Sequence, residues 1–220
     1  MRVPKNFSLR AARRAQSHIS AKVIKYDLIP LSSLKLIGGT DVAYARGRAI
    51  GAWVVLDFKT LSVVDRAVSE VEVKFPYVPT LLSFREVSPV ISAYMKLRVK
   101  PDISLVDGQG QLHPYRAGFA SHLGVVLDIA TIGVAKKLLC GTIGEWRDLW
   151  APVIDRGEII GAALKSRNKL VYVSVGNKIS LETAIEVVKS CIKDHWLPEP
   201  IRVAHSLATR IARKISKGRE

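Results

Sequence analysis

The stretch KLIGGTDVAYARGRAIGAWVVLDFKTLSVVDRAVSEVEV, residues 35–73, decides the fold class of this chain. It contains three runs rich in β-forming residues, separated by the short breaks RGR and FKT. This spacing predicts a meander of three antiparallel strands. One residue does not suit a plain buried strand, because Asp41 interrupts the first run and no turn signal follows it.

After the meander, predicted helices and strands alternate. FPYVPT at 75–80 ends the meander with two prolines, and DISLVDG at 102–108 has the continuous apolar pattern of a buried parallel strand. Helices are also predicted at 7–24, 83–99, 117–129, 180–194 and 199–215, and strands at 131–137, 157–166 and 169–177. The order favours one α/β domain over residues 1–220, with a ribonuclease H-like mixed β-sheet (antiparallel meander plus parallel strands) flanked by α-helices.

The chain is strongly basic, with 220 residues and a formal net charge of +15. Such a charge favours a polyanionic partner, with nucleic acid first and a membrane surface as the alternative. Each basic segment alone would also suit a solvated helix face. The basic residues gather near the two ends: Arg2, Lys5, Arg10, Arg13, Arg14, Lys22 and Lys25, then Arg202, Arg210, Arg213, Lys214, Lys217 and Arg219.

The cysteines and the lengths of the apolar runs indicate where in the cell the protein is expected. Cys140 and Cys191 lie far apart and form no CxxC motif, so neither a disulfide framework nor a zinc site is indicated. Arginines interrupt the apolar runs near the N-terminus, and no run reaches the roughly 18 apolar residues of a spanning helix. We expect a cytoplasmic monomer without a membrane partner.

Two carboxylates fall within or at the end of apolar strands, Asp41 in IGGTDVAY and Asp107 in ISLVDGQG. A buried carboxylate is costly unless it caps a turn or binds a cation. The following glycine makes a turn sufficient to explain Asp107, but not Asp41. On neighbouring strands, the two acids would offer hard oxygen ligands to Mg²⁺ and a phosphate.

Three further polar residues have both an ordinary and a catalytic explanation. Glu86 suits a favourable charge near a helix N-terminus, and Lys136 suits the first exposed residue after a strand. His205 lies on the far side of an apolar stripe, so it is a surface or a catalytic histidine rather than a core one. The stripe consists of Val203, Leu207, Ile211 and Ile215.

Two loops suggest contact with nucleic acid. Tyr77 lies between prolines on a stiff turn, where its ring can enter a base stack or pack on the protein's own surface. Gly108, Gly110 and Gly118 allow close approach of backbone to a ligand, although loop glycines are often only turn residues. His113 is a lone loop histidine on this pattern.

Five blocks together resemble the endonuclease V family: GGTDVAYARG, FPYVPTLLSFRE, DISLVDGQGQLHPYRAGFASHLGV, TIGVAKKLLCG and RVAHSLATR. The similarity extends from about Gly38 to about Arg210. The resemblance implies a Mg²⁺-dependent DNA repair endonuclease, with Mn²⁺ able to substitute, that recognises deoxyinosine in double- or single-stranded DNA. It implies hydrolysis of the second phosphodiester bond 3′ to the lesion, leaving 3′-hydroxyl and 5′-phosphate ends.

The resemblance also implies residue roles. Asp41 and Asp107 would be metal ligands and Glu86 the third acid, while Lys136 would contact the reacting phosphate or its leaving oxygen. His205 would help to position water or metal. The wedge and the base pocket would comprise Tyr77, Pro79, Leu82, Gly108, His113 and Gly118.

Two positions depart from the family pattern. Gln109 stands where many members have histidine, in DGQG, and Thr80 stands where many have glycine after the wedge. Three alternatives stay open: a structure-specific nuclease of the same fold acting on flaps or mismatches, a nuclease for inosine-containing RNA, and a non-catalytic basic nucleic-acid-binding module.

Overall fold

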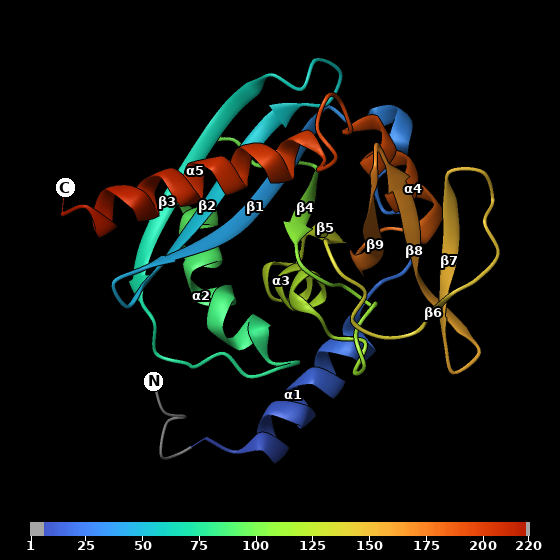
Figure 1. The fold of residues 1–220 in the computed structure, drawn as a ribbon, viewed down its shortest axis with the longest axis horizontal. Helices are drawn as coiled ribbons and strands as arrows, with labels where there is room; N and C mark the ends of the chain where they lie inside the picture. Colours follow the sequence, from blue (N-terminus) through green and yellow to red (C-terminus); the bar gives the residue numbers. More distant parts are fainter. Residues whose placement is uncertain (1–6, 219–220) are drawn as a thin grey trace.

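A computed structural model describes residues 7–218 and shows a nine-stranded mixed sheet flanked by helices (Figure 1). The strand order is β3-β2-β1-β4-β5-β9-β8-β7-β6. The predicted fold class is confirmed. The strands are β1 (Leu36–Ala45), β2 (Arg48–Asp57), β3 (Val63–Glu72), β4 (Ile103–Asp107), β5 (Ala130–Ala135), β6 (Thr142–Ile143), β7 (Trp150–Asp155), β8 (Glu158–Ser166) and β9 (Lys169–Asn177).

The helices agree with the predicted segments, apart from their ends. They are α1 (Leu9–Lys22), α2 (Leu82–Met95), α3 (Phe119–Leu127), α4 (Leu181–Ser190) and α5 (Glu199–Ser216), with a short 3₁₀ turn at Leu31–Ser33. Among residues 7–218, no helix combines the length and the apolar character needed to cross a membrane. Arg2, Lys5 and Arg219 lie outside the described residues.

The predicted meander forms β1, β2 and β3, paired antiparallel in sequence order. Both of its faces are covered, so β2 is almost entirely buried. Alternate residues of β2 serve different layers: Val54 and Leu56 join one core cluster, while Trp53 and Val55 join another. This two-sided burial explains the nearly continuous apolar sequence of the strand.

The centre of the sheet is parallel. β4 pairs with both β1 and β5, and Thr40 of β1 lies beside Val106 of β4. The next residues of the two strands are Asp41 and Asp107, so both acids lie where the parallel pairing of β1 with β4 stops, while β1 itself continues to Ala45 beside β2. The carboxyl ends of parallel strands meet there, which is where α/β folds place their functional groups.

Helices cover the two faces of this sheet separately. α4 and α5 pack on one face, α2 and α3 on the other, and α1 lies outside against α3 (Figure 1). A Cβ atom on Gly39 would lie 2.1 Å from the Pro200 carbonyl oxygen, which is impossible for a real side chain. Glycine in β1 therefore allows α5 to approach the strand that carries Asp41.

The sequence pattern did not predict β6 or β7. β7 contains Pro152, and proline removes a ladder donor, so the run resembles a loop. Its position makes the proline tolerable, because β7 is next to the sheet edge and its outer neighbour β6 has only two residues. The pairing of β7 with β8, a tertiary contact, makes it a strand.

Candidate active site

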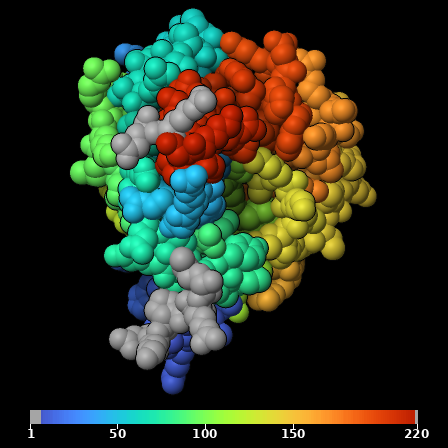
Figure 2. Space-filling view, turned by 60° about the vertical axis from the view of Figure 1, so that its left-hand side comes forward, coloured from blue at the N-terminus to red at the C-terminus, as the bar shows by residue number. Residues whose placement is uncertain are grey.

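Two acids and a histidine meet where β4 ends beside the middle of β1. Potential ligand atoms of Asp41, Asp107 and His205 all lie within 4.8 Å of one another. His205 comes from α5, and its Nδ1 lies 2.7 Å from Asp41 Oδ2. Figure 2 shows a hollow here, bordered by α5 in red and by the yellow segment that follows β5.

Glu86 reaches the same place from α2, on the other face of the sheet. Its side chain is buried, with 8% of the residue exposed, and Oε1 accepts a hydrogen bond of 3.0 Å from the Tyr44 hydroxyl. Burial, and then the negative charges of Asp41 and Asp107, raise the pKa of Glu86 to about 8. In the metal-free protein, Glu86 therefore holds its proton at neutral pH.

Lys136, just beyond β5, completes the group. Its Nζ donates to Asp107 Oδ2 at 2.5 Å. Burial and the charge of Asp41 raise the pKa of Asp107 to about 6, and the Lys136 cation opposes that rise. The fold thus brings together all five residues for which a catalytic role was predicted.

The donor set of this cluster fits a divalent cation. Carboxylate oxygens are the ligands that Mg²⁺ prefers, and an imidazole suits Mn²⁺ and related ions. The pKa values of Asp107 and Glu86 are raised partly by the neighbouring acids, so a bound cation would relieve the repulsion among these carboxyl groups that Lys136 offsets only in part. Asp41 and Asp107 are placed to hold such an ion, with His205 beside them.

A pocket of about 500 Å³ opens next to the cluster. Five of the six residues predicted for the wedge and base pocket line it: Tyr77, Leu82, Gly108, His113 and Gly118. Pro79 is not among the lining residues. Asp107 and Lys136 also line the pocket, so the cluster and the pocket share a wall.

The pocket floor is close-packed backbone. A Cβ atom on Gly118 would lie 2.2 Å from the Gln109 carbonyl oxygen, so only glycine fits there. The amide of Gly108 already donates to Val134 O and that of Gly118 to Gly110 O. These two glycines shape the floor, while unused donors are found at the start of α2, which begins at Leu82 and has no side-chain cap within the described residues.

The rim of the pocket is held in an uncommon backbone conformation. Tyr77 is 64% exposed at this rim, and Thr80 has φ +67°, a region that favours glycine. The Thr80 carbonyl accepts two hydrogen bonds, at 2.6 Å from Gln16 Nε2 and at 3.2 Å from the His113 ring. Glycine would adopt this backbone conformation at lower cost than threonine.

His113 uses both of its ring nitrogens within the protein. The amide of Tyr115 donates to Nδ1 at 3.2 Å, so Nε2 carries the proton that is donated to Thr80 O. Burial lowers the pKa of His113 to about 4, and the ring is neutral at physiological pH. His113 therefore supports the rim and presents only ring surface to the pocket.

Three residues in this region had not been assigned to the site by the sequence pattern. Gln16 is fully buried on α1 between Ala12 and Ile19, and a polar residue on that apolar face was the available signal. Tyr44 carried no such signal, and Arg13 stood out only as one of the basic residues near the N-terminus. The Arg13 guanidinium stacks 4.0 Å from the Tyr115 ring and also donates to Gln16.

The sequence of this chain is similar to those of known proteins. The family model described as Endonuclease V matches residues 17–206. The chain belongs to the endonuclease V family. Endonuclease V of Thermofilum pendens is 52% identical over 215 residues, which cover 96% of this chain and 92% of that protein.

Solved structures of endonuclease V share the same architecture. The enzyme from Streptomyces avermitilis is 36% identical, with a TM-score of 0.87, covering 97% of this chain and 98% of that one. Endonuclease V of Ciona intestinalis, in complex with DNA containing an inosine followed by a ribo-adenosine, is 30% identical with a TM-score of 0.86, covering 94% and 98%. This chain is accordingly an endonuclease.

Proposed function

We propose that this endonuclease V recognises deoxyinosine in DNA and hydrolyses the second phosphodiester bond on its 3′ side, leaving 3′-hydroxyl and 5′-phosphate ends. The shared wall of pocket and cluster, formed by Asp107 and Lys136, is the observation that carries the proposal. A base turned out of the stack would enter the pocket while its own strand crosses the acid cluster. The inosine-containing DNA bound by the Ciona intestinalis relative supports this choice of substrate.

The cation would be Mg²⁺, with Mn²⁺ able to substitute, held by Asp41 and Asp107. When bound, it would polarise the phosphate and favour a hydroxide nucleophile. Lys136 would place positive charge near the departing oxygen. Because a carboxylate can only accept a hydrogen bond, His205 Nδ1 would donate to Asp41 and orient that ligand. Glu86, which accepts a hydrogen bond from Tyr44, would hold a proton at the edge of the cluster.

Recognition would combine a wedge with backbone donors. The exposed Tyr77 ring would fill the gap that the flipped base leaves, and amides at the N-terminus of α2, beginning at Leu82, would donate to an oxygen of hypoxanthine. Flipping costs a few kcal/mol and costs less for a weakened pair, which favours deaminated adenine before any contact forms. Gln16 and His113 would hold the rim in place for this step.

A second candidate substrate is inosine followed by a ribonucleotide. The DNA bound by the Ciona intestinalis relative contains this arrangement. Substrates with a deoxy- or a ribonucleotide directly 3′ to the inosine, otherwise identical, would distinguish the two preferences through their single-turnover rates.

End-labelled duplexes with one deoxyinosine test the proposal, assayed with Mg²⁺, Mn²⁺ or EDTA. We expect a metal-dependent nick at the second phosphodiester bond 3′ to the inosine, with none for the unmodified duplex or for Asp107→Asn. Uracil, mismatch and flap substrates serve as controls for specificity. Equal rates on all of them would contradict inosine recognition, and salt-sensitive binding without any nick would assign the chain to the non-catalytic binding class.

A further inference from the structure

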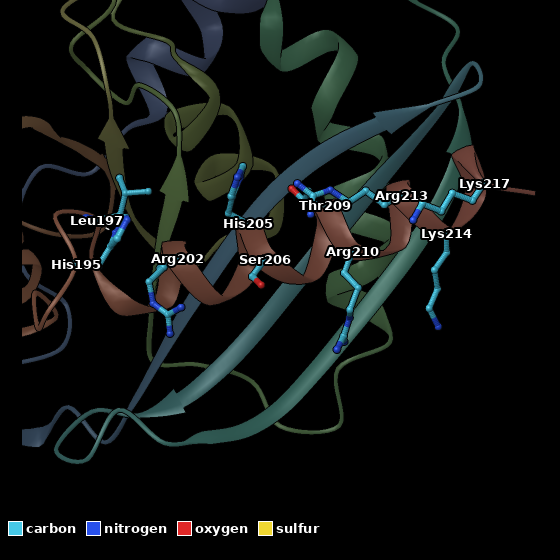
Figure 3. A pocket seen from close by; sticks show the side chains of 10 residues that line it. All are labelled: His195, Leu197, Arg202, His205, Ser206, Thr209, Arg210, Arg213, Lys214 and Lys217. Carbon is cyan, nitrogen blue, oxygen red and sulfur yellow. Dashed lines mark hydrogen bonds between the residues drawn. The ribbon is translucent and has the colours of Figure 1, made fainter. Parts of the chain in front are cut away.

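One side of α5 continues outward from the acid cluster as a row of polar and basic side chains. His205, Thr209, Arg213 and Lys217 follow one another at four-residue intervals, the spacing of a single helix face. In Figure 3, His205, Thr209 and Arg213 lie on one side of the helix, while Arg202, Arg210 and Lys214 project from the other. These residues line a groove of about 790 Å³.

Most of the positive charge in this groove is not neutralised. Arg202 is matched by Glu199, which accepts two hydrogen bonds from it at 2.7 and 2.6 Å. Within residues 7–218, no carboxylate forms an ion pair with the other four cations, Arg210, Arg213, Lys214 and Lys217. The Arg46 guanidinium adds to this charge, since it donates to Ser216 O at 2.6 Å at the end of the helix.

Helix stability alone does not explain the row. Cations in the last turn interact favourably with the helix dipole, but this effect is small at exposed sites and falls off within one turn. Arg213 and Lys214 do lie in the last turn, but Arg210 comes before it, and the row itself starts at His205, which contacts Asp41 of the cluster. A basic surface continuous with the reaction centre fits a polyanion that passes through that centre.

We propose that this face of α5 binds the sugar–phosphate backbone of the DNA strand that is cut, with Arg213 and Lys217 each contacting a phosphate. The inference rests on the proposed function. At roughly 1.5 Å per residue, the two positions lie about 12 and 18 Å along the helix axis from His205. At roughly 3.4 Å per nucleotide, the contacted phosphates lie about three to five nucleotides from the cluster.

The test combines a charge-removing variant with trimmed substrates. Arg213→Gln/Lys217→Gln is compared with the original chain for binding of a deoxyinosine duplex, by fluorescence anisotropy in EDTA over a series of salt concentrations. We expect about tenfold weaker binding at physiological salt and a salt slope lower by about 2. Trimming one flank of the cleaved strand to two nucleotides beyond the cut should remove most of this difference between the two proteins.

The matched control is Arg98→Gln/Arg156→Gln, which removes two exposed cations outside the groove, with side chains 85% and 78% exposed. Its effect on binding should not change with the length of either flank. A loss in Arg213→Gln/Lys217→Gln that is equally large on trimmed and full-length duplexes would overturn the assignment. Cleavage of the same duplexes with Mg²⁺ distinguishes the two proposals. If the original chain nicks the duplex but the binding loss in Arg213→Gln/Lys217→Gln does not depend on flank length, only the α5 surface is contradicted. If the original chain makes no nick, the proposed function is contradicted.

Discussion

The imidazole of His205 and the carboxylate of Asp41, 164 residues apart in the chain, are joined by a contact of 2.7 Å between Nδ1 and Oδ2. This contact connects α5 to β1 at the point where the pairing of β1 with β4 stops. Because an ionised carboxylate only accepts, Nδ1 is the donor in this contact. His205 therefore orients an acid that would hold the cation, in the manner of the outer partners of metal sites.

Substitutions of His205 distinguish the role of Nδ1 from that of Nε2. We expect His205→Ala to lower the single-turnover rate on a deoxyinosine duplex by about 10- to 100-fold and to raise the Mg²⁺ concentration required. His205→Asn keeps a donor near the position of Nδ1 and should recover part of the loss. A recovery by His205→Gln instead, whose amide lies nearer Nε2, would show that the contact with Asp41 is not the important one.

Glu86 should stabilise the metal-free protein only while it is protonated. Its pKa is raised from 4.5 to about 8, so the stability that it contributes is complete below pH 4.5 and is lost as the pH rises through 8. Glu86→Gln should therefore be more stable than the original chain above pH 8, by about 3 kcal/mol, and at least tenfold less active. Urea unfolding in EDTA at pH 6 and pH 9 measures this, with Glu70→Gln, an exposed carboxylate paired with Arg48, as control.

Thr80 should be a site of stored backbone strain. Its φ of +67° is costly for a β-branched residue, and its Oγ1 is buried without a partner among the described residues. Thr80→Gly removes both costs, against a smaller entropic cost from glycine in the unfolded chain, so we expect a gain of about 1 kcal/mol. The urea midpoint measures the gain, and Thr142→Gly in β6 should instead lose stability.

Gln16 should position the rim of the pocket. Gln16→Leu removes the 2.6 Å donor to Thr80 O and leaves the weaker His113 contact, so we expect a loss of about 1 to 2 kcal/mol in stability. A structural role alone would lower the rates on all substrates alike. We expect the ratio of rates for inosine over adenine to fall, which competition between the two duplexes in one reaction would measure. An unchanged ratio would limit Gln16 to folding.

A buried histidine, His113, and a half-buried one, His122, should make the protein acid-sensitive. Burial lowers the pKa values of His113 and His122 from 6.5 to about 4. Below pH 6.5 the unfolded chain takes up protons that the folded state refuses, so stability falls between pH 6.5 and 4, by roughly 3 kcal/mol for His113.

His122→Phe tests this acid sensitivity. His122 packs edge-on against Phe84, and its Nδ1 has no partner within residues 7–218, so phenylalanine keeps the packing and loses no hydrogen bond. The variant should show a shallower fall in unfolding free energy between pH 7 and pH 4.5. Replacing the exposed His18 by Asn should leave the slope as it was, and an equal slope in all three proteins would contradict the argument.

Much of the fold followed from local pattern. The three meander strands, the parallel strand ending at Asp107 and all five helices were predicted, because their apolar periodicity and breakers are local properties of the chain. β6 and β7 were not predicted, since Pro152 obscures a strand that only its pairing with β8 creates.

The site residues could be predicted only in part from the sequence. Asp41 and Asp107 stood out because a carboxylate in an apolar strand is costly unless it caps a turn or binds a cation. Glu86, Lys136 and His205 each had an ordinary structural explanation, and only the family resemblance favoured a catalytic role for them. Tyr44, which donates to Glu86, had no signal at all. The sequence by itself determined which acids would fall within or at the end of apolar strands, because strand formation there depends on nearby residues.

Only the tertiary structure decided what those acids meet. α5 brings His205 to Asp41 from one face of the sheet, and α2 brings Glu86 from the other, across separations of many residues. Gln16 reaches Thr80 from a helix 64 positions away. Such contacts depend on how whole layers pack, through features as small as the missing side chain of Gly39, and no local pattern in the chain records that geometry.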